Sequence, residues 1–172
     1  MSILSKSLER IKPSPTISVT QKARELKAKG ADIISLGSGE PDFDTPDNVK
    51  SAAIEAIKNG QTKYTAVDGT VDLKNAIVSK FKKENNLTYE KNQISVGAGG
   101  KQVIYNAFLA TINSGDEIII PSPFWVSYPD IVLLAGGIPK IIECGEEDNF
   151  KLTAKSLKKN INQRTKWLII NS

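Results

Sequence analysis

The stretch ISVGAGGKQVIYNAFLATINSGDEIIIPSPFWVSYPDIVLLAGGIPKII, residues 94–142, alternates short apolar runs with longer segments of helical spacing. It predicts strands over 94–96, 117–120 and 138–142, and helices over 102–112 and 128–135. Strands that alternate with helices form crossover units, and uninterrupted apolar strands are typical of parallel sheets that are covered on both faces. The stretch therefore predicts an α/β fold with three α/β/α layers and a mostly parallel sheet.

The same pattern extends outward from this stretch. Downstream, an acidic loop precedes a short helix near 155–160 and an apolar strand, WLII, at 167–170. Upstream, Pro13 and Pro15 predict an arm along the surface, because a residue before proline avoids the helical conformation. Between the arm and residue 94 we expect a helix that ends before Gly30, a strand over 32–36, a helix with Thr45 as N-cap and Pro46 as first residue, and a helix that ends near 84–86.

Composition excludes several classes of protein. The 172 residues are 40% hydrophobic and 24% charged, which is typical of globular domains. No histidine is present, which excludes Ser-His-Asp catalysis and histidine-ligated zinc. The single cysteine, Cys144, excludes an internal disulfide and indicates a reducing compartment. A net charge of +4 with 6% aromatic residues does not favour nucleic-acid binding, and no apolar run has transmembrane or signal-peptide length. We expect a cytoplasmic protein without nucleic-acid or membrane partners.

The glycine-rich turn VGAGGKQ, residues 96–102, joins a predicted strand to a predicted helix. Glycines allow close backbone approach, and the free N–H groups and dipole of a helix start favour an anion such as phosphate. The alternative is a connection that needs glycine for its shape alone. Gln102 stands where the Walker motif requires Ser or Thr, and it also breaks the dinucleotide fingerprint, so a nucleotide ligand is disfavoured.

The loop PSPFWVSYP, residues 121–129, follows the next predicted strand and should lie near the glycine turn, because ligands bind beyond the carboxyl ends of parallel strands. Trp125 offers a flat face to an aromatic ligand. The alternative is that Phe124, Trp125 and Tyr128 are core residues. A phosphate turn beside an indole indicates a phosphorylated heteroaromatic ligand.

The third motif is GSGEPDFDTP, residues 37–46. Gly37 and Gly39 leave the backbone bare, so their N–H groups can receive a carboxylate. The acidic side chains of this motif crowd a turn bounded by prolines, where turn formation and capping are expected uses of such residues. We therefore expect no metal site here.

Taken together, these motifs resemble the N-terminal part of the fold-type I, pyridoxal phosphate-dependent aminotransferases, and among them the bacterial aspartate and aspartate/prephenate enzymes. The resemblance spans essentially all 172 residues and rests on KPSPT at 12–16, GEPDFDTP at 39–46, KYTAVDG at 63–69, GGKQ at 99–102 and PSPFWVSYPD at 121–130. It implies an N-terminal arm and small-domain segment over 1–45, and a truncated first part of the cofactor-binding large domain over 46–172.

The resemblance also implies the residues that bind the cofactor, pyridoxal 5'-phosphate. Gly99, Gly100 and Lys101 match the turn that holds the phosphate, largely through backbone N–H groups. Trp125 matches the ring that stacks on the pyridine and lines the substrate site. Tyr64 matches a tyrosine that reaches the cofactor phosphate of the neighbouring subunit, so a homodimer is implied.

For the substrates, the resemblance implies an amino acid such as aspartate and a 2-oxo acid such as 2-oxoglutarate or prephenate. The backbone N–H of Gly39 matches a group that meets the substrate carboxylate. Lys12 matches a lysine associated with the use of prephenate, and Thr16 lies in the adjoining segment that shifts as the small domain closes. The side-chain-selecting arginines are not among the matched residues, so the amino donor stays open.

No lysine of this sequence matches the Schiff-base lysine of the family, which lies beyond Ser172 together with the partners of the pyridine nitrogen and O3′. Asn171 and Ser172 match the opening of an NSPNNPTG-type segment. We therefore expect an aminotransferase whose residues 1–172 contain no catalytic residue and are inactive alone. Two alternatives are an inactive piece of a truncated or split aminotransferase gene and an unrelated α/β module that binds a phosphorylated ligand.

Overall fold

The computed structural model describes residues 3–171, so the prediction for Ser172 lies outside the described residues. The chain divides into two compact units. The sheet unit comprises residues 3–37 and 99–171, and the helical unit comprises residues 38–98. The expected domain boundary at residue 45 stays a prediction.

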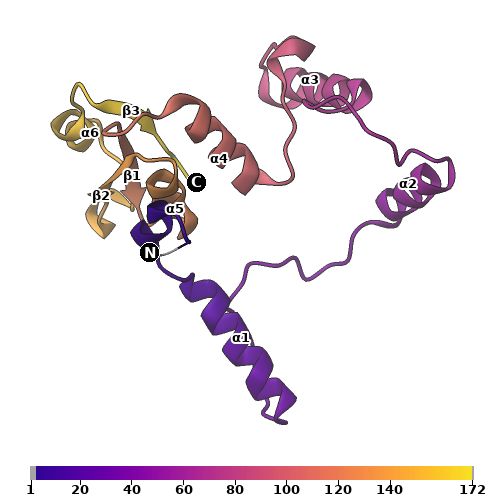
Figure 1. Cartoon of the computed structure of the whole chain (residues 1–172), viewed down its shortest axis with the longest axis horizontal. Helices are drawn as coiled ribbons and strands as arrows, with labels where there is room; N and C mark the ends of the chain where they lie inside the picture. The colour runs from indigo at the N-terminus through magenta and orange to yellow at the C-terminus, as the bar shows by residue number, and fades with distance from the viewer. Residues whose placement is uncertain (1–2, 172) are drawn as a thin grey trace. The chain divides into compact units, whose positions relative to one another are not determined.

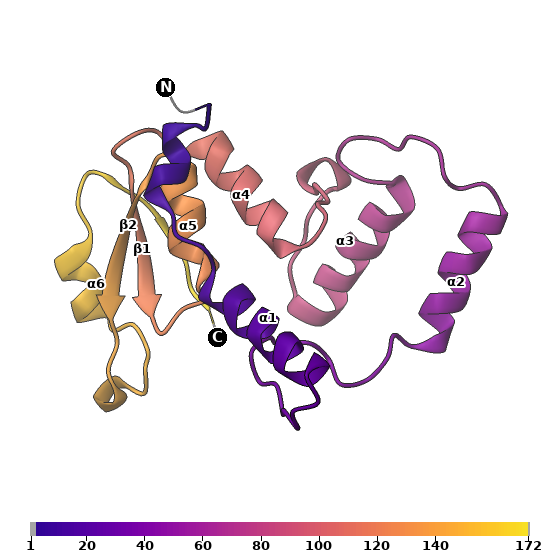
Figure 2. The ribbon, with the colours of Figure 1, turned by 60° about the horizontal axis from the view of Figure 1, so that its bottom comes forward.

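The sheet unit is built on three parallel strands, β1 (Glu117–Ser122), β2 (Ile138–Glu143) and β3 (Thr165–Leu168). Their order in the sheet is β2-β1-β3. β1 is therefore the central strand, and the connection from β2 to β3 crosses it. One face carries α4 (Gly100–Thr111) and α5 (Ser127–Leu134), and the other carries α6 (Ala154–Asn160) (Figures 1 and 2). The predicted three-layer fold is confirmed.

Alternation along β1 divides the core between the two faces, because successive side chains of a strand point to opposite sides. Ile118 and Ile120 pack under α4 and α5 with Phe108, Ile112, Tyr128, Ile131 and Val132. Ile119 points the other way and packs with Ile142 and Cys144 under α6. All three isoleucines of β1 are fully buried, which agrees with a strand covered on both faces.

A charged cluster joins the three strands near their beginnings. The Glu117 side chain is 5% exposed and forms ion pairs with Arg164 at 2.5 Å and Lys140 at 3.4 Å. Asn162 Nδ2 also donates to Glu117 Oε2 at 2.8 Å. This hydrogen bond, with the two cations, holds the pKa of Glu117 below its ordinary value of 4.5, although burial acts in the opposite direction.

The N-terminal part of the sheet unit contains η1 (Lys6–Arg10), which packs against α5, and α1 (Pro15–Ala28). Gly30 follows α1 with φ +85°, as expected of a residue that ends a helix. Pro15 is the first residue of α1, so the predicted arm ends one residue earlier. Within residues 3–171, no helix combines the length and apolar character needed to cross a membrane.

The helical unit contains α2 (Asp47–Lys58), α3 (Val71–Asn85) and η2 (Lys91–Gln93). The Thr70 hydroxyl caps α3 by accepting from the Leu73 N–H, and Asn86 ends α3 in the left-handed conformation. The backbone N–H of Val96 donates to the carbonyl of Asp68 at 3.1 Å, and Asp68 pairs with the buried ammonium of Lys74. These contacts hold the loop before α3 against residues 94–96.

Three local predictions were wrong. Residues 32–36 and 94–96, all within the described range, form no strand. Ile34 and Leu36 are almost fully exposed, and a strand needs a neighbour for its backbone groups, which an apolar run does not supply. Pro46, not Thr45, is the N-cap of α2, which starts one residue later than expected.

Candidate functional site

The glycine turn leads into α4, whose N-cap is Gly99 and whose first residue is Gly100. Gly99 has φ +86°, a conformation that residues with a side chain rarely adopt. A Cβ atom built at Gly99 or Gly100 meets no other atom within 4 Å, so space is open above the helix start. A helix start that is bare of side chains and open on one side fits an anionic group.

Trp125 lies in the loop between β1 and α5 and is 38% exposed. The Nζ atom of Lys101, in the first turn of α4, lies 5.0 Å from the centre of the indole ring. This distance is within the range of a cation–π contact. The structure thus brings the glycine turn and the aromatic loop together, as predicted, although residues 94–96 before the glycine turn form no strand.

Tyr128 contacts Trp125, and sequence reasoning missed this contact. The two rings meet edge to face, with centroids 5.3 Å apart and planes at 88°. The Tyr128 side chain is 8% exposed, and its hydroxyl donates to Asn171 Oδ1 at 3.2 Å, which joins this loop to the segment after β3. The three-residue spacing of Trp125 and Tyr128 is a signal that could have indicated the contact.

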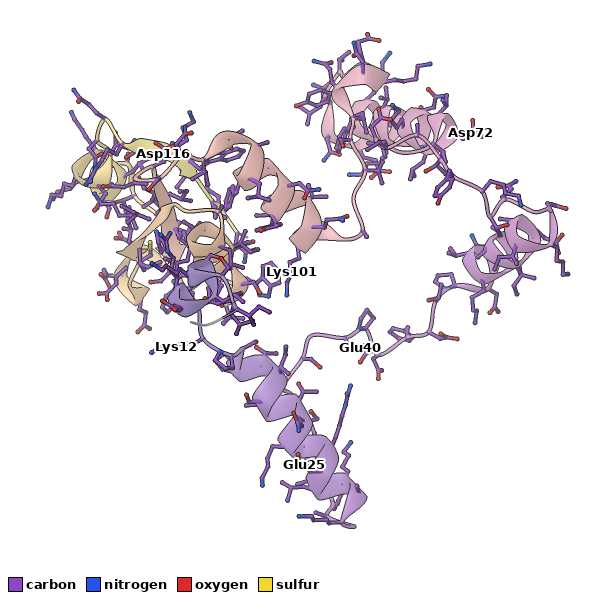
Figure 3. The ribbon with its side chains drawn as sticks, viewed as in Figure 1. Lys12, Glu25, Glu40, Asp72, Lys101 and Asp116 are labelled. Atoms are coloured by element: carbon purple, nitrogen blue, oxygen red, sulfur yellow. The ribbon has the colours of Figure 1, made fainter. Side chains whose placement is uncertain are left out.

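The other candidate residues lie apart from this cluster along the chain. Lys12 is exposed on the segment between η1 and α1 (Figure 3). Gly39 and Tyr64 belong to the helical unit, where Tyr64 is fully exposed and a Cβ atom at Gly39 meets nothing within 4 Å. The roles of these three residues stay predictions.

The acidic turn near Gly39 makes local contacts. The Asp44 carboxylate accepts from Lys50 Nζ and from the Thr45 N–H, each at 2.8 Å. These hydrogen bonds, that of Lys50 first, hold the pKa of Asp44 below its ordinary value. Asp44 therefore makes local hydrogen bonds in the turn before α2, the kind of use that sequence reasoning expected of these acids. Within residues 3–171, no three acidic, cysteine or histidine side chains gather to form a metal site.

The donor set fits a ligand that carries both a phosphate and a flat aromatic ring. The helix start at Gly99 and Gly100 supplies N–H donors with open space, and Lys101 supplies a positive charge. Trp125 supplies a partly exposed ring surface beside them. Phosphate binding at the helix start and ring stacking are compatible because Lys101, in the first turn of that helix, contacts the Trp125 ring.

Comparisons with known proteins find a matching family and similar proteins. The family described as aminotransferase class I and II matches residues 31–172. The chain is 62% identical over its full length to a probable aspartate/prephenate aminotransferase of Rickettsia bellii, and 61% identical to an aspartate/prephenate aminotransferase of Cereibacter sphaeroides. It spans 43% of the length of each of these relatives.

Solved structures give the same result. The chain is similar to an aspartate aminotransferase from Thermus thermophilus with maleate, with 42% identity and a TM-score of 0.96. The match covers the whole of this chain and 45% of that one. The chain is also similar to 43% of the aspartate aminotransferase from Rhizobium meliloti, with 45% identity and a TM-score of 0.93.

Proposed function

The chain belongs to the class I and II aminotransferases, and on that premise we propose that residues 1–172 bind pyridoxal phosphate in an enzyme that transfers an amino group. The amino donor is aspartate or a similar amino acid, and the acceptor is a 2-oxo acid such as 2-oxoglutarate or prephenate. The single structural observation that carries the proposal is the contact between Lys101 of the glycine turn and the indole of Trp125. The family match over residues 31–172 sets aside the unrelated phosphate-binding module.

Each proposed cofactor residue of the sheet unit has a distinct task. The N–H groups at Gly99 and Gly100 bind the phosphate, and Lys101 neutralises part of its charge. Trp125 orients the pyridine ring and excludes water from one of its faces. When bound, pyridoxal phosphate supplies an electron-withdrawing ring that delocalises the negative charge formed on the substrate α-carbon.

The remaining assignments extend the proposal to the substrates and to a second subunit. The N–H of Gly39 receives the substrate carboxylate, and Lys12 contributes to the use of prephenate. Tyr64 reaches the cofactor phosphate of a second copy of the chain in a homodimer. In this proposal residues 1–45 are the arm and small-domain segment, residues 46–172 belong to the large domain, and the free thiol of Cys144 supports a cytoplasmic location.

The proton transfers of the reaction need a lysine at the family's catalytic position. No lysine of residues 1–172 matches that position. We therefore propose that the chain alone binds the cofactor without catalysing the transfer, since it orients the ring and holds the phosphate but has no group to move the proton.

The test compares pyridoxal phosphate with pyridoxal, which lacks the phosphate. We expect the phosphorylated ligand to quench the tryptophan fluorescence at concentrations at least about tenfold lower, because charge-assisted hydrogen bonds to the phosphate are lost in pyridoxal. K101A and W125A should weaken binding of pyridoxal phosphate, whereas K22A, on the exposed side of α1, should not.

Two results would contradict the proposal. Equal affinity for the two ligands would remove the phosphate site. Turnover of aspartate and 2-oxoglutarate by the chain, above a control with cofactor alone, would contradict the proposed absence of a catalytic lysine.

A further inference from the structure

We propose that Tyr128 is a positioning residue that fixes the plane of the Trp125 indole for stacking on the ligand. The inference rests on the proposed function, because it concerns the ring to which stacking is assigned. Tyr128 is assigned no contact with the phosphate or with the substrate. The basis of the inference is the set of contacts that Tyr128 makes on both sides of its ring.

The backbone brings the two rings together. The Tyr128 N–H donates to the Trp125 carbonyl at 3.0 Å, so both residues belong to one turn at the start of α5. Their rings then meet at 88° with centroids 5.3 Å apart. In this arrangement the positive edge of one ring faces the negative face of the other, which favours one relative orientation.

The Tyr128 ring is itself held at both ends. Its body is buried in the core with Ile131 and Val132, above β1. Its hydroxyl donates to Asn171 Oδ1 at 3.2 Å. Figures 1 and 2 both show the segment after β3 passing beside α5, in agreement with this bond. A ring that is packed and hydrogen-bonded in this way has little freedom to turn.

Trp125 has more freedom than its support. It is 38% exposed, and its contact with Lys101 involves a long side chain with several rotatable bonds. When the indole turns, the flexible Lys101 side chain can move with it, so this contact does not fix the orientation of the ring. The orientation of the indole therefore depends on Tyr128, and through Tyr128 on Asn171, which comes from a distant part of the sequence.

The experiment uses the full chain with W167F, because Trp125 and Trp167 are its two tryptophans and this change leaves Trp125 as the single reporter. Y128F removes the hydroxyl and keeps the ring in the core. N171A removes the acceptor at an exposed position. Y105F is the matched control, since Tyr105 packs against the same core from α4.

Without ligand, we expect Y128F and N171A each to raise the acrylamide quenching of Trp125 about twofold and to lower its polarisation, because the hydrogen bond is lost in both. The double variant should show no more than the larger single effect. The affinity for pyridoxal phosphate should fall about threefold to tenfold in each variant. Y105F should match the parent in every measurement.

Three outcomes would overturn the inference. Quenching and polarisation that are equal in Y128F, N171A and Y105F would show that Tyr128 does not hold the indole. Additive effects in the double variant would show that Tyr128 and Asn171 do not act on the indole through one hydrogen bond. A lower unfolding midpoint with unchanged Trp125 signals would make Tyr128 merely structural. If the parent does not bind pyridoxal phosphate, the proposed function fails while the ligand-free signals still decide the role of Tyr128.

Discussion

Ile118, Ile119 and Ile120 of the sheet unit are fully enclosed, whereas Ile54 and Ile57 on α2 of the helical unit remain more than half exposed. The apolar run of β1 is typical of a strand covered on both faces, and the apolar residues of α2 have helical spacing. In the sheet unit, helices cover both faces of β1, so the apolar side chains are removed from water. Among residues 38–98, all of them described, the buried residues are Lys74 and Ile94. Apolar spacing therefore identifies a face that favours burial, but a second layer must supply the cover.

The largest test of this comparison is truncation of one isoleucine in each unit. Ile120→Ala should lower the free energy of unfolding by about 2–5 kcal/mol, because it removes packing and leaves a cavity. Ile54→Ala, at a half-exposed position of a helix, should cost less than about 1 kcal/mol. Urea unfolding followed by tryptophan fluorescence, which reports on Trp125 and Trp167 of the sheet unit, and by helix circular dichroism measures both. Equal losses would mean that the two units do not differ in burial.

A second test concerns backbone positions inside the helical unit. Gly69 has φ +108°, and a Cβ atom there would lie 2.7 Å from Cγ2 of Val96, whereas Gly60 has φ +71° and open space. Gly60→Ala should cost about 1–2 kcal/mol through its left-handed conformation alone. Gly69→Ala should cost more, because Val96 must also move.

Hydrogen exchange of the Val96 amide provides the local measurement, since this N–H donates to Asp68. Its protection should fall in Gly69→Ala and persist in Gly60→Ala. Equal protection in the two variants would show that the loop before α3 is not held against residues 94–96.

The smallest expected effect is a difference in pH dependence. Glu117 in the sheet unit and Asp44 in the helical unit both have lowered pKa values. A carboxylate whose folded pKa is lowered stabilises the fold above its unfolded pKa, and this contribution disappears as the pH falls through the folded value. For Glu117 the loss begins below about pH 4.5, its ordinary value.

Glu117→Gln should flatten the acid side of the stability curve, because the titrating buried carboxylate is removed and Lys140 and Arg164 lose their counter-charge at every pH. Asp44→Asn should leave the curve nearly unchanged, since its pair with Lys50 is exposed and screened. Thermal unfolding from pH 7 to pH 3 measures both. If Asp44→Asn changed the pH dependence of thermal unfolding and Glu117→Gln did not, the expected order would be wrong.

Sequence reasoning predicted the fold where local signals and tertiary structure agree. The apolar run of residues 117–120 and the glycines at 136–137 gave β1 and the turn before β2 nearly at their observed bounds. The same reasoning failed at 32–36 and 94–96, because an apolar run states a preference for burial and not the presence of a neighbouring strand. The start of α2 was misplaced by one residue, which is the usual uncertainty of a helix end.

The candidate site was predictable in part. The approach of the glycine turn to Trp125 was predicted from the motifs and from the rule that ligands bind beyond the carboxyl ends of parallel strands, although the strand expected over 94–96 is absent. The hydrogen bond between Tyr128 and Asn171 was not predictable, because it joins side chains far apart in the sequence whose rotamers depend on the packed core. Spacing identifies which residues approach a site, while packing decides how each one is held.

Cys144 follows β2 and lies 8% exposed beneath α6, beside Ile119 and Ile142. Because it is the single cysteine of the sequence, a thiol reagent added to the native chain reports on one location alone. Reaction requires α6 to separate from the sheet for a moment, so the labelling rate measures how often this layer opens. The rate at which Cys144 is labelled therefore reports local unfolding on the sheet face that α6 covers.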